Sequence, residues 1–507
     1  MGIIVLLCCD SGEKDGEPRV LVRVGERVIT ADEFTTSFEL AFAPLRMGKD
    51  PRRTYLDFLI SELLLANEGY ANRLHEHPYV QNRLARRRYF NLLESFYRKH
   101  VYAKVRVSED LLRQATLKST VKWRMLIWPL PSLEQACEAL VQARETNLAD
   151  YVEKQLDGHE VKLAERRFYE TDWIDFLDLR PEIHSKIKDL QIGQTSDPIP
   201  FAGGYALVQI LDLQLHGITE EELQHGAMRK RMQARLCNIQ ADSIGRALMD
   251  SVLTPLNIHV KGAVLEKLAP LLHRWVADGL PEDVSLVDFV RSAPDTAAAY
   301  ILELKNLLEE PLLTCRDGVK PVSSYLEHMN YFRRTLKGSA SLEDFKIRLI
   351  TEIGTMIKNE IYIKMAEAEG WADSTAIVRD LELWEQKWTF QLFRHYLVSD
   401  IEVTEQEKLG FFQHRWRELD IADVDTARYY KYDADVHNAI LHEKQLQRLR
   451  RELAELKEHY SVWVDEELLE DIELSDSPKA LSTTLFLRSN FSGHALTPTA
   501  DMSWVNL

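Results

Sequence analysis

The segment Phe96-Tyr-Arg-Lys-His-Val101, followed six residues later by Val107-Ser-Glu-Asp, has a second version near the other end of the chain. There it reads Leu392-Phe-Arg-His-Tyr-Leu397, again followed six residues later by Val403-Thr-Glu-Gln. The offset from Val107 to Val403 is 296 positions, and the two preceding segments differ by the same offset. Two matching blocks at one offset indicate an internal repeat, in which two parts of the chain share a design.

The repeat extends to both sides of these blocks. Upstream, residues 56–66 and 350–360 share helical patterning within a couple of residues of the same offset. Downstream, residues 256–268 are echoed by residues 460–472, at an offset of only 204 positions. Because the offset falls by 92, a segment of about that length, residues 118–215, is present in the first copy and absent from the second.

Residues 118–215 also differ in texture from the sequence around them. Strand-like runs at 121–129 and 205–211 alternate with helical segments at 132–143 and 181–190. The whole chain of 507 residues includes only 21 Gly and 17 Pro, so long stretches of good helix formers are uninterrupted. We expect a mainly α protein with two related helical lobes, the first interrupted by an inserted α+β domain.

These patterns predict domain boundaries. Residues 20–28 alternate as a strand and turn, and Thr30 with Glu33 has the spacing of a capping box, so a helix should begin near residue 31. Residues 20–117 form the first part of one helical lobe, 118–215 the inserted domain, 216–275 the closure of that lobe, and 276–472 the second lobe. The Ser-, Thr- and Pro-rich residues 473–507 are expected to be a flexible tail.

Composition excludes several classes of function. The chain has 63 Lys and Arg against 80 Asp and Glu, a formal charge of −17, so nucleic acid is not an expected partner. The motifs of nucleotide-binding loops, serine hydrolases, zinc proteases and thioredoxins are absent from the sequence. His75 and His77 lack further ligands at suitable spacing, and we interpret them as surface histidines rather than a metal site. We expect no cofactor.

The first residues suggest a cellular compartment. Within residues 1–12 a short apolar run stops at Cys8 and Cys9, and the sequence then turns polar. This run is too short to span a bilayer. The run resembles the end of a bacterial lipoprotein signal peptide, which implies that Cys9 is lipidated and that the protein is anchored in the cell envelope or periplasm. The alternative is an apolar N-terminus on a cytosolic protein.

The whole arrangement resembles the SurA/PrsA/PpiD group of extracytoplasmic foldases, in which a helical chaperone lobe carries a parvulin domain, a prolyl isomerase. The resemblance rests on residues 24–34 (VGERVITADEF), 179–183 (LRPEI), 190–200 (LQIGQTSDPIP) and 204–212 (GYALVQILD). It implies an ATP-independent chaperone that binds unfolded secreted or outer-membrane polypeptides, with the membrane reached through the lipid anchor and no nucleotide required.

The same resemblance bears on isomerase activity. The two His positions of the parvulin pocket fall on Arg124 and Ala206, and its Met and Phe positions fall on Leu179 and Ile183. Without the two imidazoles, the polar groups that would loosen a prolyl amide are missing. We therefore expect a degenerate parvulin-like domain, with an active peptidyl-prolyl cis-trans isomerase as one alternative and a structural envelope lipoprotein with a fixed partner as another.

Aromatic residues are the candidates for binding unfolded polypeptide, the client of a chaperone. They are dense in two stretches, and Trp384 and Trp388 lie one helical turn apart. These aromatic residues either pack between helices or line a groove that binds extended apolar segments. The candidate client-binding residues are Phe96, Tyr97, Trp384, Trp388 and Phe393.

Overall fold

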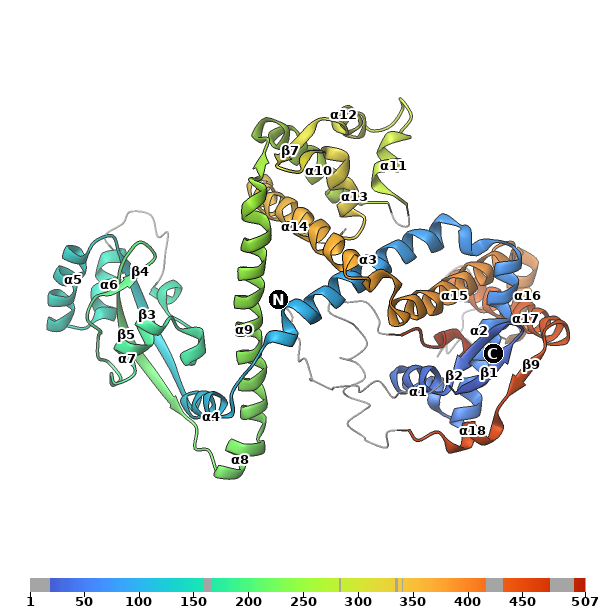
Figure 1. Ribbon diagram of the computed structural model, residues 1–507, viewed down its shortest axis with the longest axis horizontal. Helices are drawn as coiled ribbons and strands as arrows, with labels where there is room; N and C mark the ends of the chain where they lie inside the picture. Colours follow the sequence, from blue (N-terminus) through green and yellow to red (C-terminus); the bar gives the residue numbers. More distant parts are fainter. Residues whose placement is uncertain are drawn as a thin grey trace. The chain divides into compact units, whose positions relative to one another are not determined.

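The computed structural model describes residues 19–157, 166–281, 284–332, 336–339, 341–415, 432–474 and 497–506. Its contacts divide the chain into two compact units, one comprising Val101–Ala247 and the other comprising the segments through His100 and from Leu248 onward. Helices are the main elements and the sheets are small (Figure 1). The prediction of a mainly α chain is therefore confirmed.

The first unit is built around an antiparallel three-stranded sheet in the order β3-β5-β4. Its elements are α4 (Glu109–Lys118), β3 (Val121–Leu130), α5 (Leu133–Glu145), α6 (Leu148–Asp157), α7 (Pro181–Ile187), β4 (Ile199–Phe201), β5 (Gly204–Leu215), α8 (Glu220–His225) and most of α9 (Ala227–Leu253). The strands at 121–130 and 204–215 and the helices at 133–145 and 181–187 lie where the sequence predicted strands and helices.

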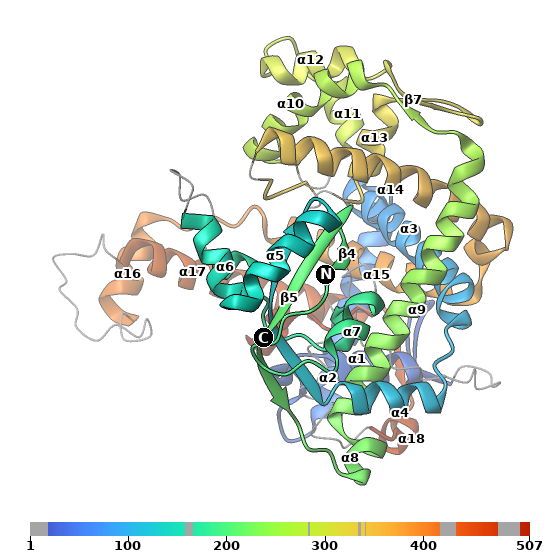
Figure 2. The ribbon, with the colours of Figure 1, turned by 90° about the vertical axis from the view of Figure 1, so that its left-hand side faces the viewer.

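Helices cover both faces of this sheet (Figure 2). On one face Leu126 and Leu207 pack with α5 and α6, and on the other Met125 and Val208 pack with α7. The split follows from the two-residue period of a strand, which sends neighbouring side chains to opposite faces. Residues 118–215 thus form a small α+β body with apolar clusters on both sides of its sheet.

The second unit has more helices. Its elements are β1 (Val20–Val24), β2 (Arg27–Thr30), α1 (Ala31–Leu40), α2 (Pro51–Ala71), α3 (Pro78–His100), β6 (His259–Val260), α10 (Gly262–Asp278), α11 (Leu286–Arg291), α12 (Ala299–Leu307), β7 (Pro311–Cys315), β8 (Gly318–Pro321), α13 (Val322–Met329), α14 (Leu342–Ala368), α15 (Thr375–Val398), α16 (Glu405–Arg415), α17 (Asp433–His459), β9 (Val462–Val464) and α18 (Glu466–Asp471). The capping box of Thr30 and Glu33 begins α1 as predicted.

Two small sheets of this unit have the same topology. In one, the hairpin β1–β2 is joined by β9, and in the other the hairpin β7–β8 is joined by β6. Each hairpin leads directly into a helix, and each third strand follows a long helix and pairs antiparallel with the first strand of its hairpin. The hairpin at 311–321 was not predicted from sequence. Gly318 in this hairpin and Gly25 in the hairpin β1–β2 both take a positive φ.

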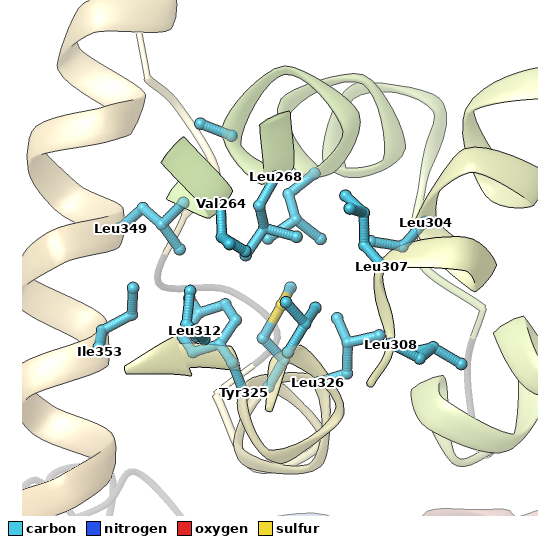
Figure 3. Close-up of a cluster of buried hydrophobic side chains, with 14 of the residues drawn as sticks. Val264, Leu268, Leu304, Leu307, Leu308, Leu312, Tyr325, Leu326, Leu349 and Ile353 are labelled. Atoms are coloured by element: carbon cyan, nitrogen blue, oxygen red, sulfur yellow. The ribbon is translucent and has the colours of Figure 1, made fainter. Parts of the chain in front are cut away.

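The two apolar cores show which segments belong together. The first core, from here the first lobe, joins residues 21–66 to side chains between Phe390 and Trp504. The second core, the second lobe, runs from Leu256 to Ile357. Figure 3 shows Val264 and Leu268 of α10 facing Leu312, Tyr325 and Leu326, with Leu349 and Ile353 of α14 closing one side.

Long helices from distant parts of the chain also pack against one another. Helix α2 packs against α15, and α3 packs against α14 and α15. The sequence pattern predicted that residues 216–275 close the first lobe, but β6 and α10 pack with the later hairpin instead. The predicted boundaries are corrected in this respect: the first lobe combines residues 21–66 with side chains from Phe390 onward, because β1 pairs with β9, whereas the second lobe is built from the continuous segment Leu256–Ile357.

Candidate functional site

The predicted client-binding aromatics of α3 are packed inside the protein. Phe96 is 0% exposed and its ring stacks on that of Tyr362 at a centroid distance of 4.5 Å. Tyr97 meets the same Tyr362 ring edge-on at 5.6 Å. These residues hold α3 against α14, so the packing interpretation replaces the proposed client contact for Phe96.

The aromatics of α15 belong to other contacts. The rings of Trp384 and Trp388 are 5.1 Å apart, and the guanidinium of Arg87 lies 5.1 Å from the Trp384 ring centroid. Phe393 packs on the core of the first lobe. The structure therefore does not bring the five predicted residues into one groove.

A groove does exist in the first lobe, and residues 497–506 of the chain lie in it. Ala500 is 3% exposed and Trp504 2%. The indole of Trp504 is stacked between Phe58 of α2 and Phe390 of α15, with centroid distances of 6.4 and 5.9 Å. The predicted flexible tail is thus wrong for these residues, whereas residues 475–496 lie outside the described part of the chain.

A buried ion pair forms the floor of this groove. Lys387 Nζ donates to both oxygens of Glu62, at 2.7 and 2.6 Å, and both side chains are more than nine-tenths buried. Glu62 Oε1 also accepts the backbone N–H of Asp501 at 2.7 Å and the indole N–H of Trp504 at 2.8 Å. Four hydrogen bonds from three donor groups compensate the loss of hydration of this carboxylate.

Main-chain groups of the C-terminal segment are held as well. Ser37 Oγ donates to the carbonyl oxygen of Pro498 at 2.9 Å, and the N–H of Ala500 donates to the hydroxyl of Tyr55 at 3.1 Å. Tyr55 donates in turn to the carbonyl oxygen of Ser37 at 3.0 Å. Burial raises the pKa of Tyr55 well above its ordinary value, so this hydroxyl stays protonated and keeps its role as donor.

The charge of Asp501 completes the fit. Arg394 of α15 lies 3.2 Å from its carboxylate, and the side chain and N–H of Ser503 donate to the same oxygen. Burial raises the pKa of Asp501, but the hydrogen bonds from Ser503 and the charges of Arg394 and Lys387 outweigh it and lower the pKa below its usual value. The segment therefore binds in its ionised form at neutral pH.

The groove continues beyond the segment. A cavity of about 70 Å³ adjoins Thr497 and Pro498, and its wall is mostly apolar. Its lining comes from the hairpin, α1, α2 and α15, through Ile29, Glu33, Leu59, Leu63, Ala66, Leu383 and Gln386. A larger apolar side chain at the position of Pro498 would have space to enter it.

The four predicted pocket positions of the α+β body are only partly brought together. Ile183 is 4% exposed and Leu179 packs on the same apolar cluster. Ala206 is buried two residues before Val208 of that cluster, so it lies on the same face of β5. Arg124 is exposed and lies between two residues that enter the cluster, so it faces away from the other three.

One histidine near these positions escaped the sequence analysis. The ring of His184 on α7 lies 5.7 Å from that of Trp123 and 6.0 Å from that of Phe176. Burial lowers the pKa of His184, and Lys118 and Lys188 lower it further. The sequence signal that could have indicated His184 is that it directly follows Ile183, one of the predicted pocket positions. It is a single imidazole, so it does not recreate the predicted pair of histidines.

Other predicted features were also located. His75 and His77 are partly buried rather than exposed, because their rings contact Tyr70 and Tyr396. Among the described residues no group of three His, Cys, Asp or Glu side chains is placed to hold a metal ion. Within the same residues no helix has the length and apolar character needed to cross a bilayer. Cys9 lies outside the part of the chain that the structure describes.

Comparisons with solved structures return PrsA and SurA-like proteins. The chain is 13% identical to a PrsA isomerase of Bacillus anthracis, with 31% of this chain and 69% of that one covered and a TM-score of 0.23. For a PrsA of Bacillus cereus the values are 14%, 45%, 89% and 0.21. For a SurA-like chaperone of Campylobacter jejuni they are 13%, 45%, 95% and 0.19.

These are the proteins that the sequence resemblance indicated, and the predicted resemblance is confirmed to that extent. No family model and no curated protein matches the chain.

Proposed function

We propose that the protein is an ATP-independent chaperone of the bacterial envelope that binds extended segments of unfolded polypeptides. The observation that carries this proposal is the groove of the first lobe, in which Pro498, Ala500 and Asp501 are held by main-chain hydrogen bonds beside the stacked indole of Trp504. Ser37, Tyr55 and Glu62 contact backbone atoms, which every polypeptide presents. These main-chain contacts do not depend on the side chains of the client, so they are available to any segment that also fills the aromatic slot.

Binding needs no energy source in this proposal. The groove combines a stacked aromatic slot with a fixed carboxylate acceptor, so an unfolded segment gains apolar burial and hydrogen bonds together. Release follows when the client folds and withdraws its apolar residues. Simple competition between folding and binding is then sufficient for the activity.

The shared topology of the two small sheets supports the repeat that the sequence indicated. We propose that the chain arose by duplication of one lobe design and that the copies exchange their ends. The hairpin of each copy pairs with the last strand of the other, β1 with β9 and β7 with β6. The α+β body of residues 118–215 is then an insertion in the first copy.

The inserted body is proposed to be a parvulin-like domain without isomerase activity. Its Leu179, Ile183 and Ala206 supply an apolar face, but the polar groups that would weaken a prolyl amide are missing there. The full-length protein should leave the rate of a proline-limited refolding reaction unchanged. A rate increase that disappears on His184→Ala would instead show an active site built on that histidine.

The predicted envelope location and the lipid anchor at Cys9 remain proposals. Expression of the full chain in bacteria with labelled palmitate tests both, since a Cys9→Ser variant should lose the label and leave the membrane fraction. Label retained in Cys9→Ser would contradict the anchor.

The chaperone proposal itself is tested by light scattering. A chemically denatured client is diluted into buffer with and without the full-length protein, in the absence of nucleotide. We expect suppression of aggregation at a stoichiometric ratio. Unchanged scattering at a severalfold excess over several unrelated clients would contradict the proposal.

A further inference from the structure

The occupant of the groove is the protein's own segment 497–506, whose Ala500 and Trp504 belong to the apolar core of the first lobe and whose main chain is held as that of a bound peptide would be. Pro498, Ala500 and Asp501 are held through main-chain atoms, Asp501 also through its carboxylate at Arg394, and the side chain of Trp504 fills the aromatic slot. Glu62 and Lys387 pair with one another, so neither charge is left without a partner when the segment leaves. Such a site can exchange one peptide for another.

We propose that residues 497–506 occupy the groove as an internal competitor, and that the clients it accepts are extended segments carrying a tryptophan. This inference rests on the proposed chaperone function and deepens it. The apparent affinity of the groove for clients is its intrinsic affinity multiplied by the fraction of molecules in which the segment has left. Residues 497–506 would thus occupy the groove until a client segment that binds more tightly displaces them.

The geometry specifies the preferred client. Tryptophan fits because the buried carboxylate of Glu62 accepts an indole N–H, which phenylalanine cannot supply. An acidic residue three positions earlier meets Arg394, as Asp501 does. A bulky apolar residue six positions before the tryptophan would reach the cavity beside Pro498. The expected pattern is apolar-x-x-acidic-x-x-Trp.

A labelled peptide tests the proposal in the full-length protein. The probe is residues 497–506 with leucine at the position of Pro498, and its affinity is measured by fluorescence anisotropy. We expect a full-length Trp504→Ala variant to bind the probe at least about tenfold more tightly than the native chain, since its own segment no longer competes. A probe with alanine in place of its tryptophan should not bind.

Trp463→Ala provides the matched control. This residue of β9 belongs to the same lobe but is 51% exposed and lies outside the groove, so its removal should leave the probe affinity at the native value. Equal affinities of the native chain and Trp504→Ala would overturn the proposal.

A second measurement guards against a variant that does not fold. Excess unlabelled probe is added to the native chain, and hydrogen exchange is followed at residues 497–506. Faster exchange there, with unchanged exchange elsewhere in the first lobe, is the expected sign of displacement. Unchanged exchange at saturating probe would contradict the proposal.

The two proposals can fail separately. If the native chain and Trp504→Ala suppress aggregation equally and the probe does not compete with clients, the internal competitor is refuted and the chaperone function stands. If neither suppresses aggregation although the probe still binds, the chaperone function is refuted, and with it the assignment of clients to this groove.

Discussion

Glu62 and Lys387 form an ion pair of 2.6 Å between α2 and α15, with only 9% and 8% of their side chains exposed. The two residues come from segments that lie on opposite sides of residues 118–215 in the sequence. Their pairing joins an early helix to a late one and at the same time offers an acceptor to the C-terminal segment. One contact thus serves both the assembly of the lobe and the occupancy of its groove.

Lys387→Met should be strongly destabilising, by about 3–5 kcal/mol, because it leaves the Glu62 carboxylate buried without its cation. The double variant Glu62→Gln, Lys387→Met should lose less than the sum of the two single variants, since neither charge is then orphaned. Urea denaturation of the four proteins gives the coupling energy. A coupling energy near zero would mean that the pair is solvated in solution.

Gly69→Ala tests the close contact of the same two helices. A Cβ at this position would lie 2.7 Å from Thr389 Cγ2 and 3.3 Å from Phe393 Cβ, so α2 and α15 would have to separate. We expect a loss of about 1–3 kcal/mol from overpacking. Gly354→Ala on α14, where a Cβ meets open space, is the matched control and should gain up to about 1 kcal/mol. Thermal melts of both variants distinguish the two effects, and a stabilised Gly69→Ala would contradict the packing.

Arg87→Lys tests the contact of α3 with α15. The guanidinium of Arg87 holds both oxygens of Asp380 at 2.7 Å, and Asn91 donates to one of them at 2.6 Å. Lysine keeps the charge but not the two-pronged geometry, so we expect a loss of about 1–3 kcal/mol. Arg98→Lys, in an exposed pair with Glu94, should change stability by no more than about 0.5 kcal/mol. Similar losses of unfolding free energy for the two variants in urea denaturation would refute the role of the two hydrogen bonds from the Arg87 guanidinium.

The third ionic contact predicts a pH dependence. Glu369, just after α14, accepts from Lys99 at 2.9 Å, from Trp371 at 3.1 Å and from His100 at 2.7 Å. The hydrogen bond from Lys99 lowers its pKa most, and with those from Trp371 and His100 it brings the pKa to about 2 despite some burial. A lowered carboxyl pKa stabilises the fold above the pKa of the unfolded chain, about 4.3, and the effect is lost as the pH falls toward 2.

Glu369→Gln should therefore reduce the free energy of unfolding at pH 7 by about 1 kcal/mol, a value kept small because water screens this partly exposed cluster. The difference from the native chain should shrink between pH 4.3 and pH 2. Guanidinium denaturation across this range measures it. A difference that stays constant down to pH 2 would show that the carboxylate charge is not responsible.

Much of the local structure could be predicted from the sequence. The strand and turn before Thr30, the capping box with Glu33 and the strands within residues 118–215 rest on short-range patterns, and each lies where it was expected. Such features depend on alternation and capping, which neighbouring residues determine.

The pairing of distant segments could not be predicted in this way. Nothing in the sequence of β6 states that it pairs with β7 rather than with β1, because both hairpins offer similar edges. The groove was missed for a related reason. Residues 497–506 have the composition of a loose tail, and only the isolated Trp504 signals an anchor, whose partners Phe58 and Phe390 are far away in the sequence.

The pairing of Val22 in β1 with Val464 in β9 has a consequence for biosynthesis. The ribosome makes β1 several hundred residues before β9, so the edge of the hairpin has no partner while the intervening chain is being made. Formation of such a distant contact is slow, and the apolar face beneath it stays open meanwhile. A protein proposed to bind unfolded polypeptides would thus itself expose an unpaired strand edge before it has folded.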